Sequence, residues 1–291
     1  MMIPTEAEIA RLPEIAAWLE GQYNLKARHP EREAIYAGYT ARSQHFRDAG
    51  PWECLRYAEP ERCTIDWFPA RGAKNAPLLI FIHGGFWRGG EKRVFSFLAE
   101  PYAEAGVAVA LIGYELAPAV TLTRIVEQIV QAVAWLNAHA ARLGFDASRV
   151  TISGHSAGGH LSALLSTMPP DRFGGHGFHG VLPISGIFEL APMLLTSINH
   201  ESRITAEEAA TLSPMRKESF LGRRYWVVAG QGETEDFVAQ TRRFGAMMEQ
   251  ARPGSGATIV PGRNHFDIFE EFADPSSQLF QAALALITSS A

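Results

Sequence analysis

Residues 154–158 read G-H-S-A-G and follow the apolar run 150–152 after a single serine. A serine in a G-x-S-x-G pattern between a strand and a helix sits on a sharp turn, so its oxygen is exposed above the end of a sheet. The backbone N–H of the following residue points into the same space. The pattern predicts that Ser156 is a nucleophile for acyl transfer. That chemistry also needs a base, an acid that orients the base, and donors for the oxyanion.

The base is expected late in the chain. In proteins whose nucleophile lies on such a strand-to-helix turn, the catalytic groups follow in the order serine, acid, histidine. The chain has ten histidines, but only His265 follows the apolar run 225–229. It lies in the loop 261–266, just after another apolar run at 257–260. Loops at strand ends carry catalytic groups more often than other segments do. We therefore predict that His265 is the base.

The acid is expected in the segment 230–236, after the run 225–229. Three carboxylates stand there. Glu233 follows the turn that ends the strand, from where its side chain can reach a neighbouring loop. Glu235 and Asp236 fit the first turn of a helix, where acidic residues are stabilised by the helix dipole. We predict that Glu233 is the acid and keep Asp236 as the reserve.

The oxyanion donors are expected at residues 83–87, which read H-G-G-F-W after the apolar run 78–82. Glycines there allow backbone N–H groups to face a substrate, as in the H-G-G-G loops of lipases and esterases. The predicted donors are the N–H groups of Gly85, Phe86 and Ala157. The histidine that opens this motif is expected to anchor the loop rather than act as a base.

Two further histidines flank the proposed nucleophile. His155 fills the variable position of the G-x-S-x-G pattern, and His160 lies one turn into the following helix, so both are expected to pack against or support the site. Phe86 and Trp87 bring aromatic surface near the mouth, which suits an aryl or planar substrate. Ordinary core packing explains these two aromatic side chains equally well.

Short apolar runs alternate with amphipathic stretches along most of the chain. Runs that are apolar on both faces are typical of buried parallel strands, and their alternation with helices predicts an α/β fold with helices on both faces of a mostly parallel sheet. The expected strands are 78–82, 108–112, 150–153, 181–184, 225–229 and 257–260. The expected helices are 91–105, 122–143, 157–168, 234–251 and 276–289.

Two segments stand outside this rhythm. Residues 5–20 carry a helical pattern, and we interpret residues 1–60 as a helical extension packed on the α/β domain 61–291. Residues 190–223 are partly amphipathic and lie between two expected strands. An insertion there would lie over the carboxyl edge of the sheet, where ligands bind in open α/β folds. We predict a small helical cap, with a surface excursion as the alternative.

The composition excludes several classes of protein. The formal net charge of -5 over 291 residues argues against nucleic-acid binding. No signal peptide, membrane span or P-loop pattern is recognised. Two cysteines, Cys54 and Cys63, are too few for a disulfide framework or a zinc site and predict reduced thiols in a cytoplasmic protein. We expect a small-molecule substrate, no cofactor and no metal. The oligomeric state stays open, with a homodimer among the options.

Taken together, these motifs resemble those of the serine-dependent kynurenine formamidases, a branch of the α/β-hydrolase superfamily close to the hormone-sensitive-lipase-like esterases. Residues 83–87 match the H-G-G-x-W motif of that branch, and 154–160 match its nucleophile turn. Residues 230–237 are similar to its acid loop and 114–118 to its Y-x-L-A-P segment. The pair at 23–24 matches an N-terminal Tyr-Asn pair of the branch. The resemblance runs in order from about residue 20 to the end.

The resemblance implies an α/β-hydrolase that cleaves an N-formyl aryl amide or a related amide, or a carboxylesterase acting on short-chain or aryl esters. A non-catalytic binding protein on the same fold is the alternative from another class. The family's oxyanion donors carry over to Gly85 and Phe86. Glu233 stands where the family usually has Asp. Other kynurenine formamidases use a metal held by a His/Asp-rich motif, which is not found in this sequence. The pocket residues that we expect are Trp87, His155 and Tyr23.

Overall fold

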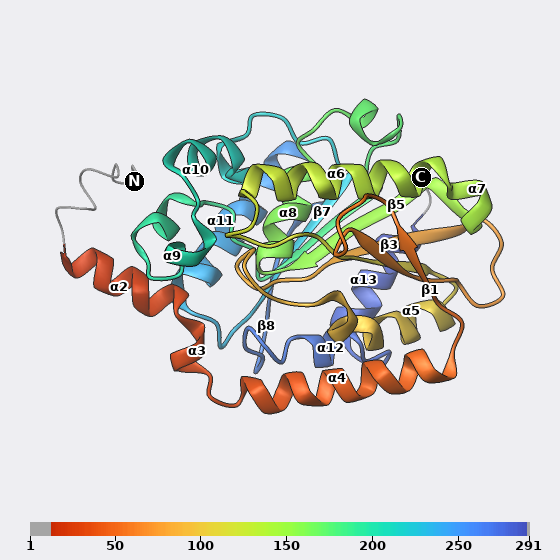
Figure 1. Ribbon diagram of the computed structural model, residues 1–291, viewed down its shortest axis with the longest axis horizontal. Coiled ribbons are helices and arrows are strands. Elements are labelled where there is room, and N and C mark those ends of the chain that lie inside the picture. The colour runs from red at the N-terminus through yellow and green to blue at the C-terminus, as the bar shows by residue number, and fades with distance from the viewer. Residues whose placement is uncertain (1–12, 290–291) are drawn as a thin grey trace.

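A single eight-stranded sheet runs through the computed structural model, which describes residues 13–289 (Figure 1). The strand order is β1-β2-β4-β3-β5-β6-β7-β8. The strands are β1 (Glu53–Arg56), β2 (Thr64–Phe68), β3 (Ala76–Ile82), β4 (Ala108–Ile112), β5 (Phe145–His155), β6 (Gly180–Ile184), β7 (Arg224–Gly230) and β8 (Gly256–Val260).

The six apolar runs of the sequence all fall in strands β3 to β8, and these strands pair in parallel. Strands β1 and β2 add an antiparallel edge. The prediction of a mostly parallel α/β sheet is therefore confirmed. Because parallel strands meet at one edge with their carboxyl ends, the loops after β3, β5, β6, β7 and β8 converge there.

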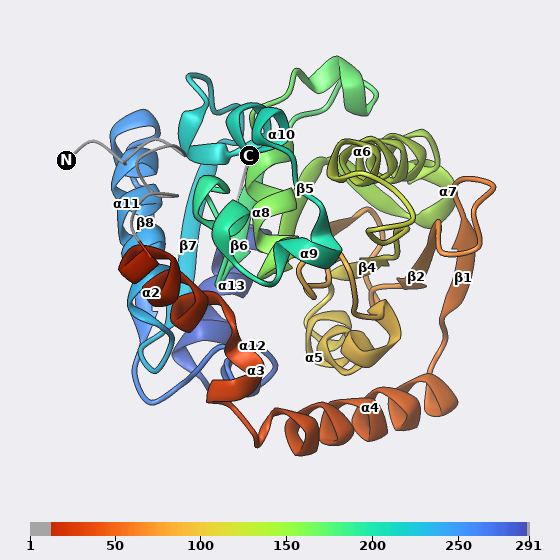
Figure 2. The ribbon, with the colours of Figure 1, turned by 60° about the vertical axis from the view of Figure 1, so that its left-hand side comes forward.

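Helices cover both faces of the sheet (Figure 2). Helices α6, α8 and α11 contribute to one hydrophobic cluster, and η1, α5, α12 and α13 to the other. The α-helices after residue 50 are α5 (Ala99–Glu104), α6 (Leu122–Ala138), α7 (Ala140–Leu143), α8 (Ala157–Leu165), α9 (Asn199–Ser202), α10 (Ala206–Leu212), α11 (Glu235–Ala251), α12 (Phe269–Phe272) and α13 (Gln278–Thr288). The 3-10 helices are η1 (Lys92–Leu98), η2 (Pro170–Phe173), η3 (Ala191–Leu195) and η4 (Pro214–Arg216).

The N-terminal part forms α2 (Pro13–Tyr23), α3 (Leu25–Arg28) and α4 (Arg32–Ala49), and α4 lies along η1 (Figure 1). The start of the expected helix 5–20 lies outside the described residues. Segment 1–60 is not wholly helical, because it contains β1. That strand has three exposed residues of four and no apolar run, so the hydrophobic pattern could not identify it.

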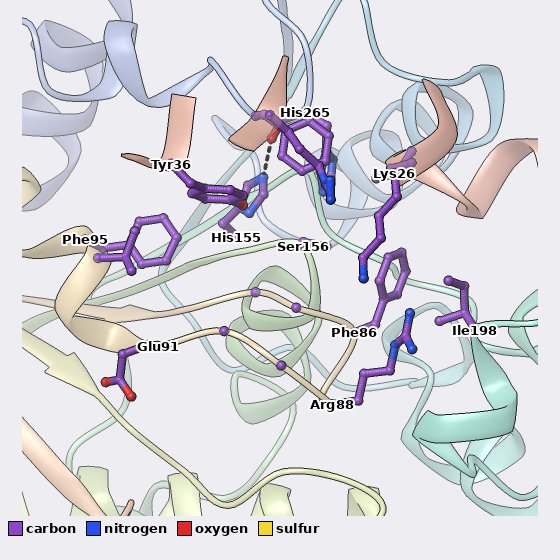
Figure 3. Close-up of a pocket in the computed structure, with 18 of the residues that line it drawn as sticks. Lys26, Tyr36, Phe86, Arg88, Glu91, Phe95, His155, Ser156, Ile198 and His265 are labelled. Atoms are coloured by element: carbon purple, nitrogen blue, oxygen red, sulfur yellow. Dashed lines mark hydrogen bonds between the residues drawn. The ribbon is translucent and has the colours of Figure 1, made fainter. Parts of the chain in front are cut away.

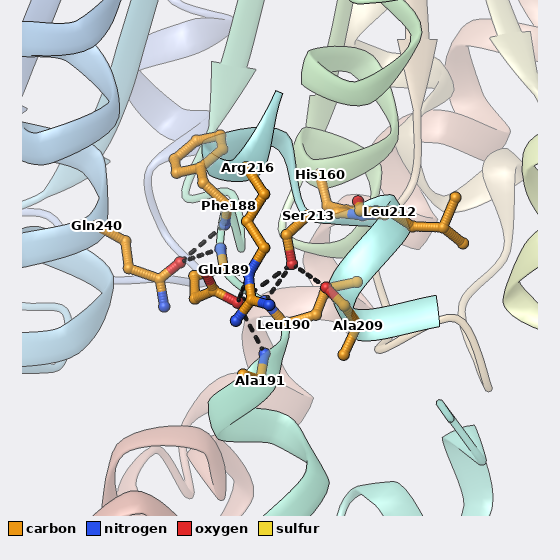
Figure 4. Close-up of polar contacts among 10 residues, drawn as sticks. All are labelled: His160, Phe188, Glu189, Leu190, Ala191, Ala209, Leu212, Ser213, Arg216 and Gln240. Carbon is orange, nitrogen blue, oxygen red and sulfur yellow. Dashed lines mark hydrogen bonds and ion pairs between the residues drawn. The ribbon is translucent and has the colours of Figure 1, made fainter. Parts of the chain in front are cut away.

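The segment 190–223 folds into η3, α9, α10 and η4 and is held to the rest of the domain by polar contacts (Figure 4). The Glu189 carboxylate pairs with Arg216 at 2.9 Å. The side-chain oxygen of Gln240 in α11 accepts the backbone N–H groups of Phe188 and Glu189 at 2.8 and 2.9 Å. The start and the end of the segment are therefore held close to α11.

The turn from β5 into α8 depends on glycine. A Cβ at Gly158 would stand 1.9 Å from the carbonyl oxygen of Ile82, and one at Gly154 would stand 2.4 Å from the oxygen of Gly158. No side chain fits in either place. The two glycines let α8 start directly against β3, which places Ser156 at the carboxyl edge of the sheet. Within residues 13–289, no helix is long and apolar enough to cross a membrane.

Candidate active site

Ser156 occupies a strained turn between β5 and α8. Its backbone has φ +55° and ψ -117°, a combination that is costly for a residue with a Cβ and is often found at functional sites. The N–H of Ser156 donates to the carbonyl oxygen of Ile184 at 2.9 Å, which fixes the turn to β6. The side chain lines a cavity although the residue is only 2% exposed.

His265 and Glu233 meet beside this cavity. The distance between His265 Nδ1 and Glu233 Oε2 is 2.8 Å, and both side chains are buried. A carboxylate only accepts hydrogen bonds, so Nδ1 carries the hydrogen and Nε2 of the neutral ring keeps a lone pair. His265 lines the same cavity as Ser156. The structure thus brings together the serine, histidine and acid that the sequence predicted.

The second carboxylate oxygen of Glu233 is also hydrogen-bonded. Its Oε1 accepts a hydrogen bond from Ser185 Oγ at 2.5 Å and one from the N–H of Gly230 at 2.7 Å. Ser185 was missed in the sequence. A small polar residue directly after the run 181–184, at the end of the strand next to β7, is the signal that could have found it. Three hydrogen bonds to one carboxylate hold it in a fixed orientation.

The reserve acid Asp236 lies in a different contact network. Tyr23 donates its hydroxyl to the Asp236 carboxylate, and Gln240 donates its amide to the same oxygen at 2.8 Å. Burial and the nearby carboxylate raise the pKa of Tyr23 well above its usual range, so its hydroxyl keeps the hydrogen that it donates. The structure brings Glu233, and not Asp236, to His265.

Two of the three expected pocket residues are not in the pocket. Tyr23 is fully buried under α11, where its hydroxyl reaches Asp236 instead of the cavity. Trp87 is also fully buried, with its ring edge-on to His160 at 5.0 Å between centroids. Phe86 and Trp87 both have φ near +55°, and only Phe86 lines the cavity. The expectation was therefore wrong for Tyr23 and Trp87, whereas His155 lines the cavity as expected.

The carbonyl groups of Gly84 and Gly85, in the glycine loop after β3, both have partners within hydrogen-bond distance. The oxygen of Gly84 lies 2.8 Å from His83 Nδ1, and the oxygen of Gly85 accepts the N–H groups of Arg88 and Gly89 at 3.1 and 3.0 Å. In a trans peptide the N–H points opposite to the carbonyl. The N–H groups of Gly85 and Phe86 therefore point away from these partners, and both residues line the cavity.

The segment 190–223 reaches this loop directly. Ser202 Oγ in α9 donates to the carbonyl oxygen of Phe86 at 2.8 Å, and Glu201 forms an ion pair with Arg88. Ser202 is buried, and Ile198 and Glu201 line the cavity. The same short helix thus contributes to the wall of the cavity and holds the loop that carries the expected oxyanion donors.

The cavity has a volume of about 590 Å³ and extends to both sides of Ser156 (Figure 3). Tyr36 and Phe95 lie on one side, and Lys26 and Phe86 lie on the other. Such a volume accommodates a drug-sized molecule, and the lining offers aromatic surface with a few polar groups. None of Lys26, Tyr36 and Phe95 was singled out in the sequence, because α3, α4 and η1 carry no motif.

Comparison with known proteins decides the family. The kynurenine formamidase of Danio rerio is 30% identical over 238 residues, which cover 79% of this chain and 80% of that protein. The chain belongs to the α/β-hydrolase family that includes the kynurenine formamidases. The kynurenine formamidase of Drosophila melanogaster is 26% identical over 235 residues. The BD-FAE family model matches residues 66–179 of this α/β-hydrolase.

Solved structures agree on the fold of the hydrolase. One from Silicibacter sp., named as a candidate thioesterase, has a TM-score of 0.80 and 31% identity and covers 93% of this chain and 99% of its own. An esterase from Pyrobaculum calidifontis has a TM-score of 0.73 at 17% identity, covering 95% of this chain and 98% of its own. At that identity the likeness concerns the fold alone.

The α/β-hydrolase has no cluster of three or more His, Cys, Asp or Glu residues placed to hold a metal ion within residues 13–289. Cys54 is exposed and Cys63 is buried, and both are free thiols.

Buried histidines of the hydrolase make its stability depend on pH. Burial lowers the pKa of His83 to about 4 and that of His160 to about 4. Below pH 6.5 the unfolded chain binds protons on these rings that the folded chain does not, so the free energy of unfolding falls as the pH drops toward 4. Between pH 7 and pH 5 we expect a loss of about 2 kcal/mol for each ring, measured by urea unfolding.

The variant His160→Gln provides the matched control for this prediction. His160 Nε2 lies 2.8 Å from the carbonyl oxygen of Leu212, and a glutamine amide can donate there without binding a proton. The loss of stability between pH 7 and pH 5 should shrink by about 2 kcal/mol in this variant. An unchanged loss would show that His160 is not held neutral in the folded protein.

Proposed function

We propose that this protein is a serine hydrolase that cleaves an N-formyl aryl amide by acyl transfer. The observation that carries the proposal is the hydrogen bond between His265 and Glu233 in the wall of the cavity that Ser156 also lines. The kynurenine formamidase names of the relatives supply the substrate class. The cavity supports an aryl group, because Tyr36 and Phe95 lie on one side of Ser156.

The proposed reaction has two halves. Ser156 Oγ attacks the formyl carbon while His265 Nε2 takes its proton, and Glu233 stabilises the imidazolium that forms. The N–H groups of Gly85, Phe86 and Ala157 hold the negative oxygen of the tetrahedral intermediate. His265 then gives the proton to the leaving amine, so that the C–N bond breaks and a formyl ester of Ser156 remains. Water attacks this ester with the same base, and formate leaves.

Carboxylester hydrolysis is the second candidate, because it would use the same groups and because several relatives carry that name. The carboxylic ester hydrolase LipM of Mycobacterium tuberculosis is 29% identical over 206 residues, although these are only 47% of that protein. A non-catalytic binding protein is the candidate from another class. The presence of a serine, a histidine and an acid at one cavity favours an enzyme over it. Cytoplasmic location, independence of cofactors and a homodimer remain predictions.

A substrate panel tests the proposal. N-formyl aryl amines and short-chain aryl esters with the same ring should be compared by kcat/KM, with a chelator present in a parallel series. We expect the N-formyl amines to be the better substrates and the chelator to have no effect. A protein that hydrolyses the esters and leaves the amides untouched is a carboxylesterase, and one that loses activity with the chelator depends on a metal.

A further inference from the structure

His155 stands directly before the proposed nucleophile, and one of its ring nitrogens has a defined partner. Nε2 lies 2.8 Å from the carbonyl oxygen of His265. A carbonyl oxygen only accepts, so Nε2 carries the ring hydrogen and Nδ1 of the neutral ring carries a lone pair. Burial, together with the neighbouring His265, lowers the pKa of His155 well below its usual range. The ring therefore stays neutral, with Nδ1 as an acceptor.

The free nitrogen lies close to the reacting atoms. A Cβ built on Gly84 would stand 3.2 Å from His155 Nδ1 and 3.0 Å from Ser156 Cβ, so the acceptor and the nucleophile flank the same glycine. All three residues line the cavity, and Figure 3 shows the His155 ring between Tyr36 and Ser156. Within residues 13–289, no group donates a hydrogen bond to Nδ1. The lone pair of His155 Nδ1 therefore accepts no hydrogen bond from these residues.

We infer that His155 Nδ1 accepts a hydrogen bond from the N–H of the scissile amide. This inference rests on the proposed function and adds to it the feature that selects the substrate. The amide nitrogen is bonded to the carbon that Ser156 attacks, so it lies within reach of an acceptor that flanks the same glycine. An ester has no hydrogen at this position and leaves Nδ1 without a partner. Sites built to bind a substrate N–H discriminate against analogues that lack it.

Two substitutions distinguish the roles of the two ring nitrogens of His155. In His155→Gln the side-chain amide can donate to the carbonyl oxygen of His265, as Nε2 does, but no acceptor stands in the place of Nδ1. In His155→Asn the side-chain oxygen replaces Nδ1, whereas the donor to His265 is lost. The first variant therefore tests the acceptor, and the second tests the support of His265.

The experiment compares both variants with the wild-type protein on formanilide, N-methylformanilide and phenyl formate. The three compounds share a formyl group and a phenyl ring, but only formanilide has the N–H. We expect His155→Gln to lower kcat/KM for formanilide about tenfold, the effect of one hydrogen bond, and to change the other two less than twofold. His155→Asn should lower kcat/KM for all three compounds to a similar extent. The phenyl formate activity also shows whether each variant is folded.

Three results would overturn the inference. An equal loss on all three compounds in His155→Gln would mean that His155 acts only through His265. An unchanged rate with formanilide would mean that Nδ1 contacts nothing in the reaction. A wild-type protein that cleaves phenyl formate and neither amide would overturn the proposed function, and the inference with it. This last result comes from the wild type alone and is thereby distinguished from the first two.

Discussion

Replacing Ser156 by alanine should lower kcat by about 10⁴- to 10⁶-fold, the effect of removing the nucleophile from a serine hydrolase. The side chain provides the oxygen that forms the acyl bond in the proposed reaction. Alanine keeps the Cβ and the backbone, so the folded structure should be retained. Turnover of the best substrate of the panel and labelling by a fluorophosphonate probe measure the effect, and both should disappear.

Ser162 provides the matched control for this prediction. It lies in the same helix α8, is buried, and donates its hydroxyl to the carbonyl oxygen of Gly159 at 2.9 Å. Ser162→Ala should keep its turnover and its labelling. A Ser156→Ala protein with full turnover would exclude the nucleophile assignment. A wild-type protein that is neither active nor labelled would support the non-catalytic binding protein.

Glu233→Gln should lower kcat by about 10⁴-fold, the effect seen when the acid of a serine triad becomes an amide. The amide can donate to His265 Nδ1, which favours the tautomer with its hydrogen on Nε2. That tautomer has no lone pair on the nitrogen that must take the proton from Ser156. Binding of substrate depends little on this change, so KM should change much less than kcat.

Asp236→Asn distinguishes between the two acids that the sequence offered. Its side-chain oxygen can still accept the Tyr23 hydroxyl, and the residue has no contact with His265 among the described hydrogen bonds. We therefore expect kcat within about twofold of the wild type, as for most substitutions outside a site. The reverse result, a loss in Asp236→Asn and none in Glu233→Gln, would assign the acid to Asp236.

The sequence predicted those parts of the fold and site that depend on local chemistry. Six strands appeared as apolar runs, and the order of Ser156, Glu233 and His265 placed these residues after the correct strands. The edge strand β1 could not be predicted, because three of its four residues are exposed and it carries no hydrophobic pattern.

Side-chain direction was the part that the sequence could not supply. Phe86 and Trp87 are neighbours with left-handed backbone angles, and nothing in their types says which one faces the cavity. Tyr23 and Asp236 are 213 residues apart in sequence, and their contact depends on how α2 packs against α11. Ser185 supports Glu233 from the next strand and belongs to no motif. Such contacts follow from tertiary packing.

The hydrogen bond from Ser202 to Phe86 couples the segment 190–223 to the glycine loop, and this affects how the substrate choice of the protein can change. Ser202 belongs to α9. Glu201 in the same helix and Ile198 just before it line the cavity, where a bound substrate would contact them. An exchange of this segment for that of a relative would therefore alter the choice of substrate and the geometry of the glycine loop in the same step. We expect substrate choice and turnover to change together in such a chimera, unless Ser202 keeps its hydrogen bond to Phe86.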